Sequence, residues 1–223
     1  RAGLRPALIF HQPPSRSTPL LHLCAWFWIL IAGNSSMNLG ICVGHSRGGG
    51  DRGGGDRGAI SLWRESEWDY NSKVAAELKA ELDRRGIDSF VIDDYKHAGY
   101  SSGIRHCAKL LRDQGATHTL ELHFNAATPS AHGAEWIHWH NSSGGKRLAE
   151  SIQAGFTQTF PTIRDRGVKP RHARQRGSLF LRLTPCPAVI CEPFFGSNEG
   201  DCAEFEGKEA DLALAYAEGI SRL

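Results

Sequence analysis

Residues 38–45 read NLGICVGH, a short apolar run that ends in Gly44-His45. An apolar run of this length, bounded by glycine, is typical of a buried β-strand. A glycine tract follows, in which GGGDR occurs twice, at residues 48–52 and 53–57. We expect this tract to form a flexible loop between the first strand and the next element.

Segments with strand and helix patterns alternate from Met37 to the end of the chain. In the first helix, Tyr70, Val74, Leu78 and Leu82 share one face, and Ser66 supplies an N-cap. The predicted helices are 66–86, 101–115, 144–160 and 206–223; the predicted strands are 38–45, 89–93, 117–126, 133–140 and 187–195, with an Arg-rich loop at 164–177. This order predicts a single α/β domain with a twisted mixed β-sheet flanked by helices on both faces.

Composition limits the classes of protein that the chain can represent. A length of 223 residues suits one domain, and 40% apolar with 22% charged residues is the balance of a globular protein without stable membrane insertion. The net charge of +2 gives no argument for nucleic-acid binding. The six cysteines show no C-x-x-C spacing, so we expect reduced, mostly buried thiols.

Residues 1–36 differ from the remainder and are expected to lie outside the fold. They are rich in Pro and Arg and contain LLHLCAWFWILIAG at residues 20–33. That run is too short to span a bilayer as a helix, and it resembles the apolar part of a signal peptide. Alternatively, Met37 is the true start and the preceding stretch is a translated leader. Either interpretation leaves 37–223 as the folded domain.

The glycine tract also contains a G-x-G-x-x-G match at Gly48, Gly50 and Gly53. A dinucleotide-binding turn requires a helix to begin directly at the last glycine, where its N-terminus faces the pyrophosphate. Here the tract continues through DRGAISLWRE before any helical pattern begins. We attribute the match to glycine abundance.

Polar residues at strand ends indicate a metal site instead. His45 and His123 each end a predicted strand, Glu67 lies in the first turn of the first helix, and Glu192 interrupts an apolar strand. Catalytic zinc is commonly held by two histidines and one carboxylate with one position open to water. Simpler roles exist for each residue alone: a structural histidine, a carboxylate favouring a helix N-terminus, or a paired core carboxylate. Their combination favours a metal centre.

Four motifs in order resemble the zinc-dependent N-acetylmuramoyl-L-alanine amidases of the type 3 class, especially the endolysin-like members from bacteriophages and prophages. The motifs are Gly44-His45, Glu67 followed four residues later by Asn71, ELHFNA with His123 and Asn125, and PAVICEPFFGSN with Glu192. The resemblance covers residues 37–223. It implies an enzyme that hydrolyses the amide between N-acetylmuramic acid and L-alanine of the peptidoglycan stem.

The resemblance also implies roles for individual residues. His45, Glu67 and His123 would hold Zn²⁺, Asn125 would contact substrate, and Glu192 would act first as general base and then as general acid. A zinc ion so held polarises the amide carbonyl and activates water. We expect a monomer with peptidoglycan as partner, made in the bacterial host cytoplasm and acting on the cell wall or periplasm. Export by the N-terminal segment is left open.

Several residues depart from the family pattern or compete for a role. The first motif, usually Asp-Pro-Gly-His-Gly-Gly, is here Cys-Val-Gly-His-Ser, Glu121 replaces a serine, and Pro193 replaces a glycine. Glu65 competes with Glu67, whose spacing to the following asparagine is favoured. His138 and His140 could form a second metal pair, but we interpret them as structural or cleft-lining.

The segment RDRGVKPRHARQRG, residues 164–177, is strongly basic. It lacks interleaved aromatic residues and any DNA-reading motif, so no nucleic-acid partner is expected. It is either a solvated loop or a rim that attracts the carboxylates of peptidoglycan, through Arg171, Arg174 and Arg176.

The alternative functions for the protein as a whole are a zinc peptidase that cleaves another peptidoglycan amide and a non-catalytic cell-wall-binding module.

Overall fold

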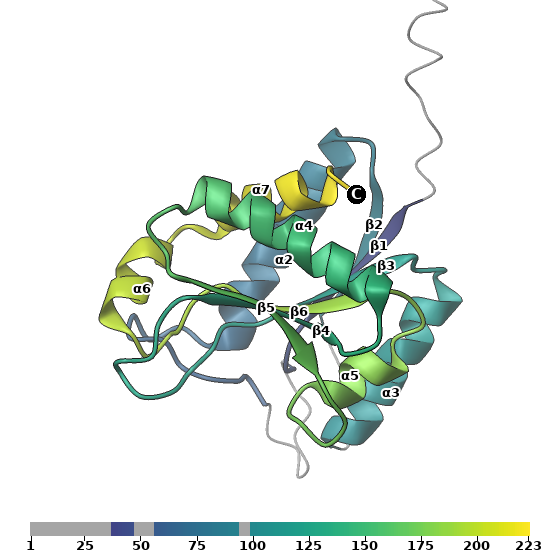
Figure 1. Cartoon of the computed structure of the whole chain (residues 1–223), viewed down its shortest axis with the longest axis horizontal. Helices are drawn as coiled ribbons and strands as arrows, with labels where there is room; N and C mark the ends of the chain where they lie inside the picture. Colours follow the sequence, from purple (N-terminus) through teal and green to yellow (C-terminus); the bar gives the residue numbers. More distant parts are fainter. Residues whose placement is uncertain (1–36, 47–55, 94–98) are drawn as a thin grey trace, which may run out of the picture. The chain divides into compact units, whose positions relative to one another are not determined.

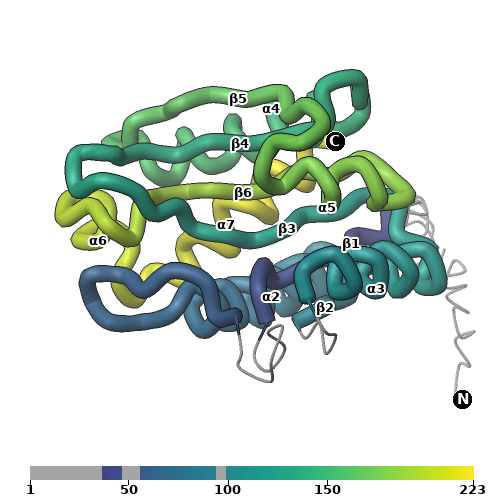
Figure 2. Tube along the Cα trace, turned by 90° about the horizontal axis from the view of Figure 1, so that it is seen from below, coloured from purple at the N-terminus to yellow at the C-terminus, as the bar shows by residue number. Residues whose placement is uncertain are grey.

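The first predicted strand, β1 (Asn38–Val43), lies inside a six-stranded sheet. The computed structural model describes residues 37–46, 56–93 and 99–223, all within one compact unit. The strand order is β2-β1-β3-β6-β4-β5, which can be followed in Figure 2. The other strands are β2 (Asp88–Ile92), β3 (His118–Leu122), β4 (Ala134–Trp139), β5 (Asp165–Arg171) and β6 (Ala188–Glu192).

The sheet is mixed, as predicted, because one of its strand pairs runs antiparallel. β1 pairs parallel with β2 and β3, β3 with β6, and β4 with β5, whereas β4 and β6 are antiparallel. In that antiparallel pair Glu135 lies opposite Glu192. The start of β4 therefore lies at the same edge of the sheet as the carboxyl ends of β1, β3 and β6.

Helices cover both faces of the sheet (Figure 1). On one face lie α2 (Glu67–Arg84), α4 (Ser143–Thr159) and α7 (Glu209–Ile220). On the other face lie α3 (Tyr100–Asp113) and α5 (Ser178–Leu183). A short helix, α6 (Glu199–Phe205), precedes α7. The predicted fold class is confirmed.

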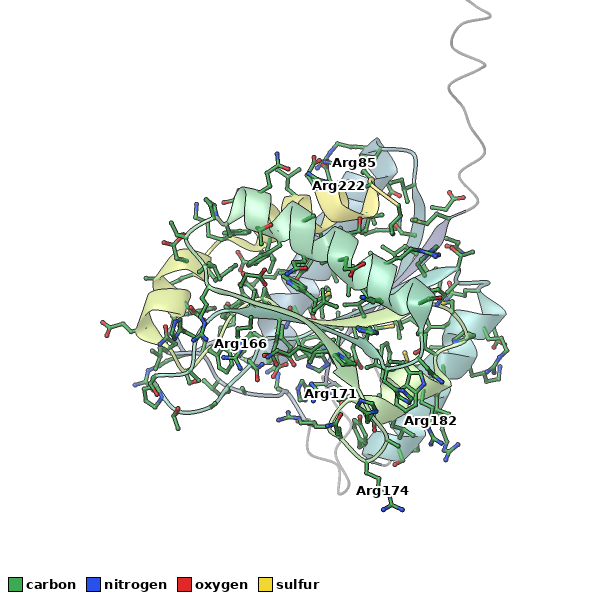
Figure 3. The ribbon with its side chains drawn as sticks, in the orientation of Figure 1. Arg85, Arg166, Arg171, Arg174, Arg182 and Arg222 are labelled. Atoms are coloured by element: carbon green, nitrogen blue, oxygen red, sulfur yellow. The ribbon has the colours of Figure 1, made fainter. Side chains whose placement is uncertain are left out.

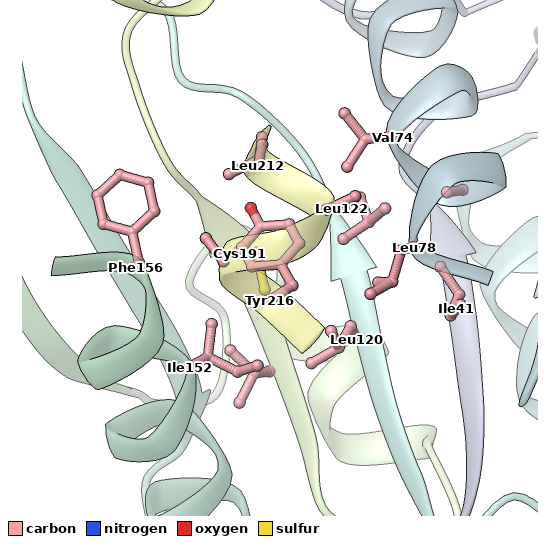
Figure 4. Close-up of a cluster of buried hydrophobic side chains, with 14 of the residues drawn as sticks. Ile41, Val74, Leu78, Leu120, Leu122, Ile152, Phe156, Cys191, Leu212 and Tyr216 are labelled. Atoms are coloured by element: carbon pink, nitrogen blue, oxygen red, sulfur yellow. The ribbon is translucent and has the colours of Figure 1, made fainter. Parts of the chain in front are cut away.

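The larger core lies between the sheet and α2, α4 and α7 (Figure 4). Tyr216 and Leu212 of α7 pack there with Leu120 and Leu122 of β3, and all four are fully buried. The ring of Trp136 on β4 meets those of Phe156 and Tyr216. Burial of this apolar surface supplies the main driving force for folding. It also fixes α2 against β1, and α2 begins with Glu67, one of the predicted metal ligands.

The first helix begins and ends at the predicted signals. The Ser66 side chain accepts a hydrogen bond from the backbone N–H of Asp69, and Gly86 adopts φ +69° just beyond the last turn. The predicted face of Tyr70, Val74, Leu78 and Leu82 is fully buried. In α3 the predicted inward residues Ile104, Cys107, Ala108 and Leu111 are buried too.

Two predictions about the second half of the chain are wrong. The predicted Arg-rich loop contains strand β5, which pairs with β4 alone and forms the edge of the sheet. An edge strand tolerates polar residues and a proline such as Pro170, because one side of it needs no hydrogen-bonded partner. The final predicted helix, 206–223, begins only at Glu209, and α6 forms before it with Asn198 as N-cap.

The cysteine prediction is confirmed for the described chain: five free cysteines, of which four are buried and Cys186 is partly exposed. Within the described residues no helix is long and apolar enough to cross a membrane. The predicted leader, residues 1–36, and most of the repeated glycine tract, residues 47–55, lie outside the described residues.

Candidate functional site

The carboxyl ends of three adjacent strands bring together three of the predicted site residues. His45 lies two residues after β1, His123 directly follows β3, and Glu192 is the last residue of β6. All three line one cavity of about 950 Å³. In open α/β sheets, ligands bind in the crevice outside the carboxyl ends of the strands, and this cavity has that location.

Glu67 joins the two histidines from the first turn of α2. Its Oε1 lies 2.7 Å from Nδ1 of His123, and its Oε2 lies 3.1 Å from Nε2 of His45. Backbone N–H groups of Phe124 and Ala59 donate to the same carboxylate, at 3.2 and 3.1 Å. The Glu67 side chain is therefore fixed from four directions, and the carboxylate is almost completely buried.

Two glycines make room for this arrangement. A Cβ at Gly44 would come within 2.2 Å of the His123 ring. A Cβ at Gly58 would come within 2.5 Å of Oε2 of Glu67, and this glycine also adopts φ +75°. His45 itself has φ +67°, an uncommon conformation for a residue with a side chain. The backbone around the first histidine is thus shaped for close approach of the three side chains.

The charges of the three groups depend on one another. Burial opposes ionisation of Glu67, but the hydrogen bond with His123 and the charge of the nearby His45 ring lower its pKa below the usual range. Burial alone would lower the pKa of His45, yet the Glu67 carboxylate outweighs it and raises that pKa. The pKa of His123 is raised well above its usual value against the effect of burial, by Glu121 and Glu67. The site thus attracts positive charge.

The donor set fits a zinc ion. One ligand atom from each of His45, Glu67 and His123 lies within 4.8 Å of the other two. Nε2 of His45 is buried and has no hydrogen-bond partner among the described residues, although it points to this cluster. Imidazole and carboxylate donors of this number and kind are those of catalytic zinc centres.

Two further carboxylates lie outside this cluster. Oδ1 of Asp56 is 3.1 Å from Nδ1 of His45, and Oε2 of Glu121 is 3.5 Å from Nε2 of His123. Each histidine therefore has one ring nitrogen toward Glu67 and the other toward a second carboxylate. Neither Asp56 nor Glu121 was predicted as a site residue. Glu121 was recognisable as a charge within a buried strand, whereas no local pattern links Asp56 to His45, from which residues 47–55 separate it in the chain.

Glu192 lies on the cavity wall beside this cluster. Burial is the main cause that raises its pKa to about 8; His123 opposes the rise, and the negative charges of Glu67 and Glu135 add to it. Its Oε2 is buried and has no hydrogen-bond partner within the described parts of the chain. A carboxylate with a free oxygen and a pKa near neutrality is suited to accept and return a proton.

Asn125 belongs to a polar network on the same cavity wall. Its Nδ2 donates to Oε1 of Glu135 at 3.2 Å, while Arg166 and Lys169 donate to Oε2 of Glu135 at 2.7 and 2.6 Å. The two cations lower the pKa of Glu135 although burial opposes ionisation. Sequence reasoning missed Glu135, because only the antiparallel pairing of β4 with β6 brings it to this edge.

The predicted basic residues divide into two groups. Arg171 and Arg176 line the cavity, and Nε of Arg171 is buried with no hydrogen-bond partner in the described chain. Arg174 lies at an exposed turn, does not line the cavity, and extends away from the ribbon in Figure 3. A carboxylate inside the cavity would therefore be near Arg171 and Arg176 and not near Arg174.

The remaining candidates lie apart from the metal-type cluster. Glu65 accepts a hydrogen bond from the Trp63 indole at 2.9 Å and pairs with Lys73 at 2.6 Å. Asn71 donates to the backbone carbonyl of Glu67, so it supports the helix start. Nδ1 of His138 lies 2.9 Å from the carbonyl oxygen of Trp139, and His140 stacks on the ring of His172. Of the two competing residues Glu65 and Glu67, it is therefore Glu67 that contacts both histidines.

Fold and site together define an α/β protein with a cavity and a candidate metal centre at the carboxyl edge of its sheet. The chain belongs to the Amidase_3 family of N-acetylmuramoyl-L-alanine amidases, whose sequence profile matches residues 39–222. This membership supports a peptidoglycan amidase function. A search of curated proteins gave no match.

Solved structures with the same fold include several amidases. Amidase AmiC2 of Nostoc punctiforme has 22% identity and a TM-score of 0.68, with 83% of this chain and 96% of that chain covered. Amidase CwlD from Clostridioides difficile, solved in complex with the GerS lipoprotein, has 21% identity and a TM-score of 0.71, with 83% and 97% covered. The catalytic domain of the CD27L endolysin targeting Clostridia difficile has 22% identity and a TM-score of 0.69, with 83% and 97% covered. At these identities, the likeness shows a shared fold.

Proposed function

We propose that the chain is a zinc-dependent N-acetylmuramoyl-L-alanine amidase, which hydrolyses the amide between N-acetylmuramic acid and the first L-alanine of the stem peptide. The observation that carries the proposal is the convergence of His45, Glu67, His123 and Glu192 in one cavity. Family membership over residues 39–222 supports the substrate class.

In this mechanism His45, Glu67 and His123 would hold the metal. A zinc ion there would supply Lewis-acid chemistry, which polarises the amide carbonyl and lowers the pKa of water. Ala59 and Phe124 keep the Glu67 carboxylate in place through their N–H groups, at 3.1 and 3.2 Å. No reorientation of that ligand is then needed when substrate enters.

Glu192 moves the proton. Its unpartnered Oε2 accepts a proton from the attacking water as the water oxygen bonds to the carbonyl carbon. The same oxygen then returns that proton to the amide nitrogen as the C–N bond breaks, which leaves a lactyl carboxylate and the amine of L-alanine. Burial raises the pKa of Glu192 to about 8, and a cation held beside it would lower that pKa and favour the ionised form that accepts the proton.

The other side of the cavity is suited to bind the substrate. Arg171 and Arg176 present positive charge to the carboxylates of the stem peptide, and Asn125 offers an amide beside Glu135. Arg174, at the exposed turn, would act on approach to the wall rather than in the cavity. We propose that this charge distribution serves an endolysin-like enzyme that acts on the wall as a monomer.

Analysis of the products from purified peptidoglycan tests the proposal. We expect one new L-alanine amino terminus for each lactyl carboxylate that is freed on an N-acetylmuramic acid residue, with the glycan chains left intact. A peptidase acting within the stem would expose other amino termini, and a binding module would expose none. Chelation should abolish release and added zinc should restore it. Either of the other product patterns would contradict the proposal.

A further inference from the structure

Glu121 is a buried carboxylate in the cavity wall to which the mechanism above gives no role. It lies on β3, where alternation places it on the same side as His123 and opposite the core residues Leu120 and Leu122. Only 4% of the residue is exposed, and its neighbours in the sheet are Cys42 and Ile190. A charge in such surroundings is unfavourable unless a partner compensates it.

The partner is one specific nitrogen of His123. Oε2 of Glu121 lies 3.5 Å from Nε2, and the described residues offer the Glu121 side chain no other hydrogen bond or ion pair. The opposite nitrogen, Nδ1, lies 2.7 Å from Glu67. The two nitrogens of an imidazole point away from each other, so Glu121 and Glu67 hold the ring from its two ends.

His45 shows the same arrangement with other partners. Its Nε2 faces Glu67 at 3.1 Å, and its Nδ1 faces Asp56 at 3.1 Å. Metal-binding histidines commonly donate the N–H of their outer nitrogen to a carboxylate, which fixes the proton position and the orientation of the ring. The cavity contains one such outer carboxylate for each histidine.

We propose that Glu121 is a positioning residue for His123. It accepts the hydrogen of Nε2, so that Nδ1, which faces Glu67, is the nitrogen that gives up its hydrogen when it becomes the metal ligand. The inference rests on the proposed metal centre and adds to it the residue that orients the second histidine. Glu121 is not itself a ligand, because it faces the nitrogen that points away from the cluster.

Zinc affinity of the whole chain is the first test, measured by competition with a chromophoric chelator. Glu121→Gln keeps the size of the side chain but removes its charge, and we expect zinc to bind about 10- to 100-fold more weakly. Glu121→Asp, which keeps the charge, should bind zinc more tightly than Glu121→Gln. The matched control is Glu150→Gln, an exposed carboxylate on α4, which should bind as the wild type does.

The outcomes separate this inference from the proposed function. If the wild-type chain binds no zinc, the proposed metal centre is wrong and this inference is wrong with it. A wild-type chain that binds zinc, with equal affinity in Glu121→Gln, would overturn only the role of Glu121.

A second measurement needs no variant and so does not depend on the folding of Glu121→Gln. In the zinc-loaded wild type, nitrogen NMR of labelled histidines reports which ring nitrogen carries the proton. We expect the proton of His123 on Nε2 and the metal on Nδ1. Metal on Nε2 would overturn the inference.

Discussion

Nδ1 of His123 lies 2.7 Å from Oε1 of Glu67, although 56 positions separate these residues in the chain. His123 directly follows β3 and Glu67 begins α2. Both elements are fixed by the core that α2 shares with the sheet. The relative position of the two side chains is therefore set by packing. A metal ion that binds here meets donors that are already assembled, and little ordering opposes binding.

The three proposed ligands should be needed for zinc binding, and the neighbouring carboxylate should not. We expect His45→Ala, Glu67→Ala and His123→Ala to lose stoichiometric zinc after dialysis, because each removes one of three protein donors. Glu65→Ala is the control, since Glu65 pairs with Lys73 and bonds to Trp63 instead. Metal analysis of the folded proteins measures this. Full zinc occupancy in any of the three variants would remove that residue from the ligand set.

Metal-free protein should become less stable as the pH rises from about 6 to 9. The pKa values of His45, His123 and Glu192 are raised in the folded state, so in this range the folded chain holds more protons than the unfolded chain. Their stabilising contribution is present below the unfolded pKa of each group and is lost as the pH rises through the folded pKa. Melting temperatures in the presence of a chelator measure the effect.

The pKa of Glu67 shifts in the opposite direction, and this shift should make the metal-free protein less stable in acid. Its pKa is lowered in the folded state, so its contribution is present above about pH 4 and is lost as the pH falls further. Zinc should reverse the alkaline trend, because bound metal replaces the protons, and the gain in melting temperature from zinc should be larger at pH 8 than at pH 6. Glu192→Gln should flatten the metal-free profile. A metal-free melting temperature that rises from pH 6 to 9 would contradict these assignments.

Neutralising the cavity arginines should weaken binding to peptidoglycan. In the double variant Arg171→Gln and Arg176→Gln, we expect reduced binding at low salt and a weaker dependence of binding on salt, because fewer charges meet the stem carboxylates. Arg174→Gln should have the smaller effect, since this side chain lies outside the cavity. Co-sedimentation with purified cell walls over a salt series measures both. An unchanged salt dependence in the double variant would rule out a substrate role for these two residues.

Helix α7 offers a matched pair of leucines for testing the fold. Leu212 is fully buried between the sheet and α2, whereas Leu214 is 42% exposed. Leu212→Ala should lower the free energy of unfolding by about 2–5 kcal/mol, through lost burial and a residual cavity. Leu214→Ala should change it by less than about 0.5 kcal/mol. Denaturant titration of both variants makes the comparison, and equal effects would contradict the packing described.

The sequence predicted those helices and strands whose own residues favour the structure that they adopt. The helical spacing of Tyr70, Val74, Leu78 and Leu82 together with Ser66 and Gly86 predicted α2, and the apolar run of residues 38–45 predicted β1. Strand β5 was missed because its stability comes from pairing with β4, while Gly167 and Pro170 are unfavourable locally. Edge strands that depend on a neighbour carry little signal of their own.

The site was predictable only where a residue type is unusual for its position. His45, His123 and Glu192 stood out as polar groups at the ends of apolar strands, and the structure brings all three to one cavity. Glu135 depends on the antiparallel register of β4, and Asp56 contacts His45 although residues 47–55 separate them in the chain. Both are relationships between distant segments, which periodicity does not report.

Glu192 tests the central claim most directly, because its role is chemical and its substitution leaves the proposed ligands in place. The measurement is the release of L-alanine amino termini from purified peptidoglycan by Glu192→Gln, beside its zinc content. We predict one zinc ion per chain, as in the wild type, and a rate lower by about 10²- to 10⁴-fold, which is the usual contribution of general acid–base catalysis. A zinc-loaded Glu192→Gln protein that releases these termini at the wild-type rate would contradict the account.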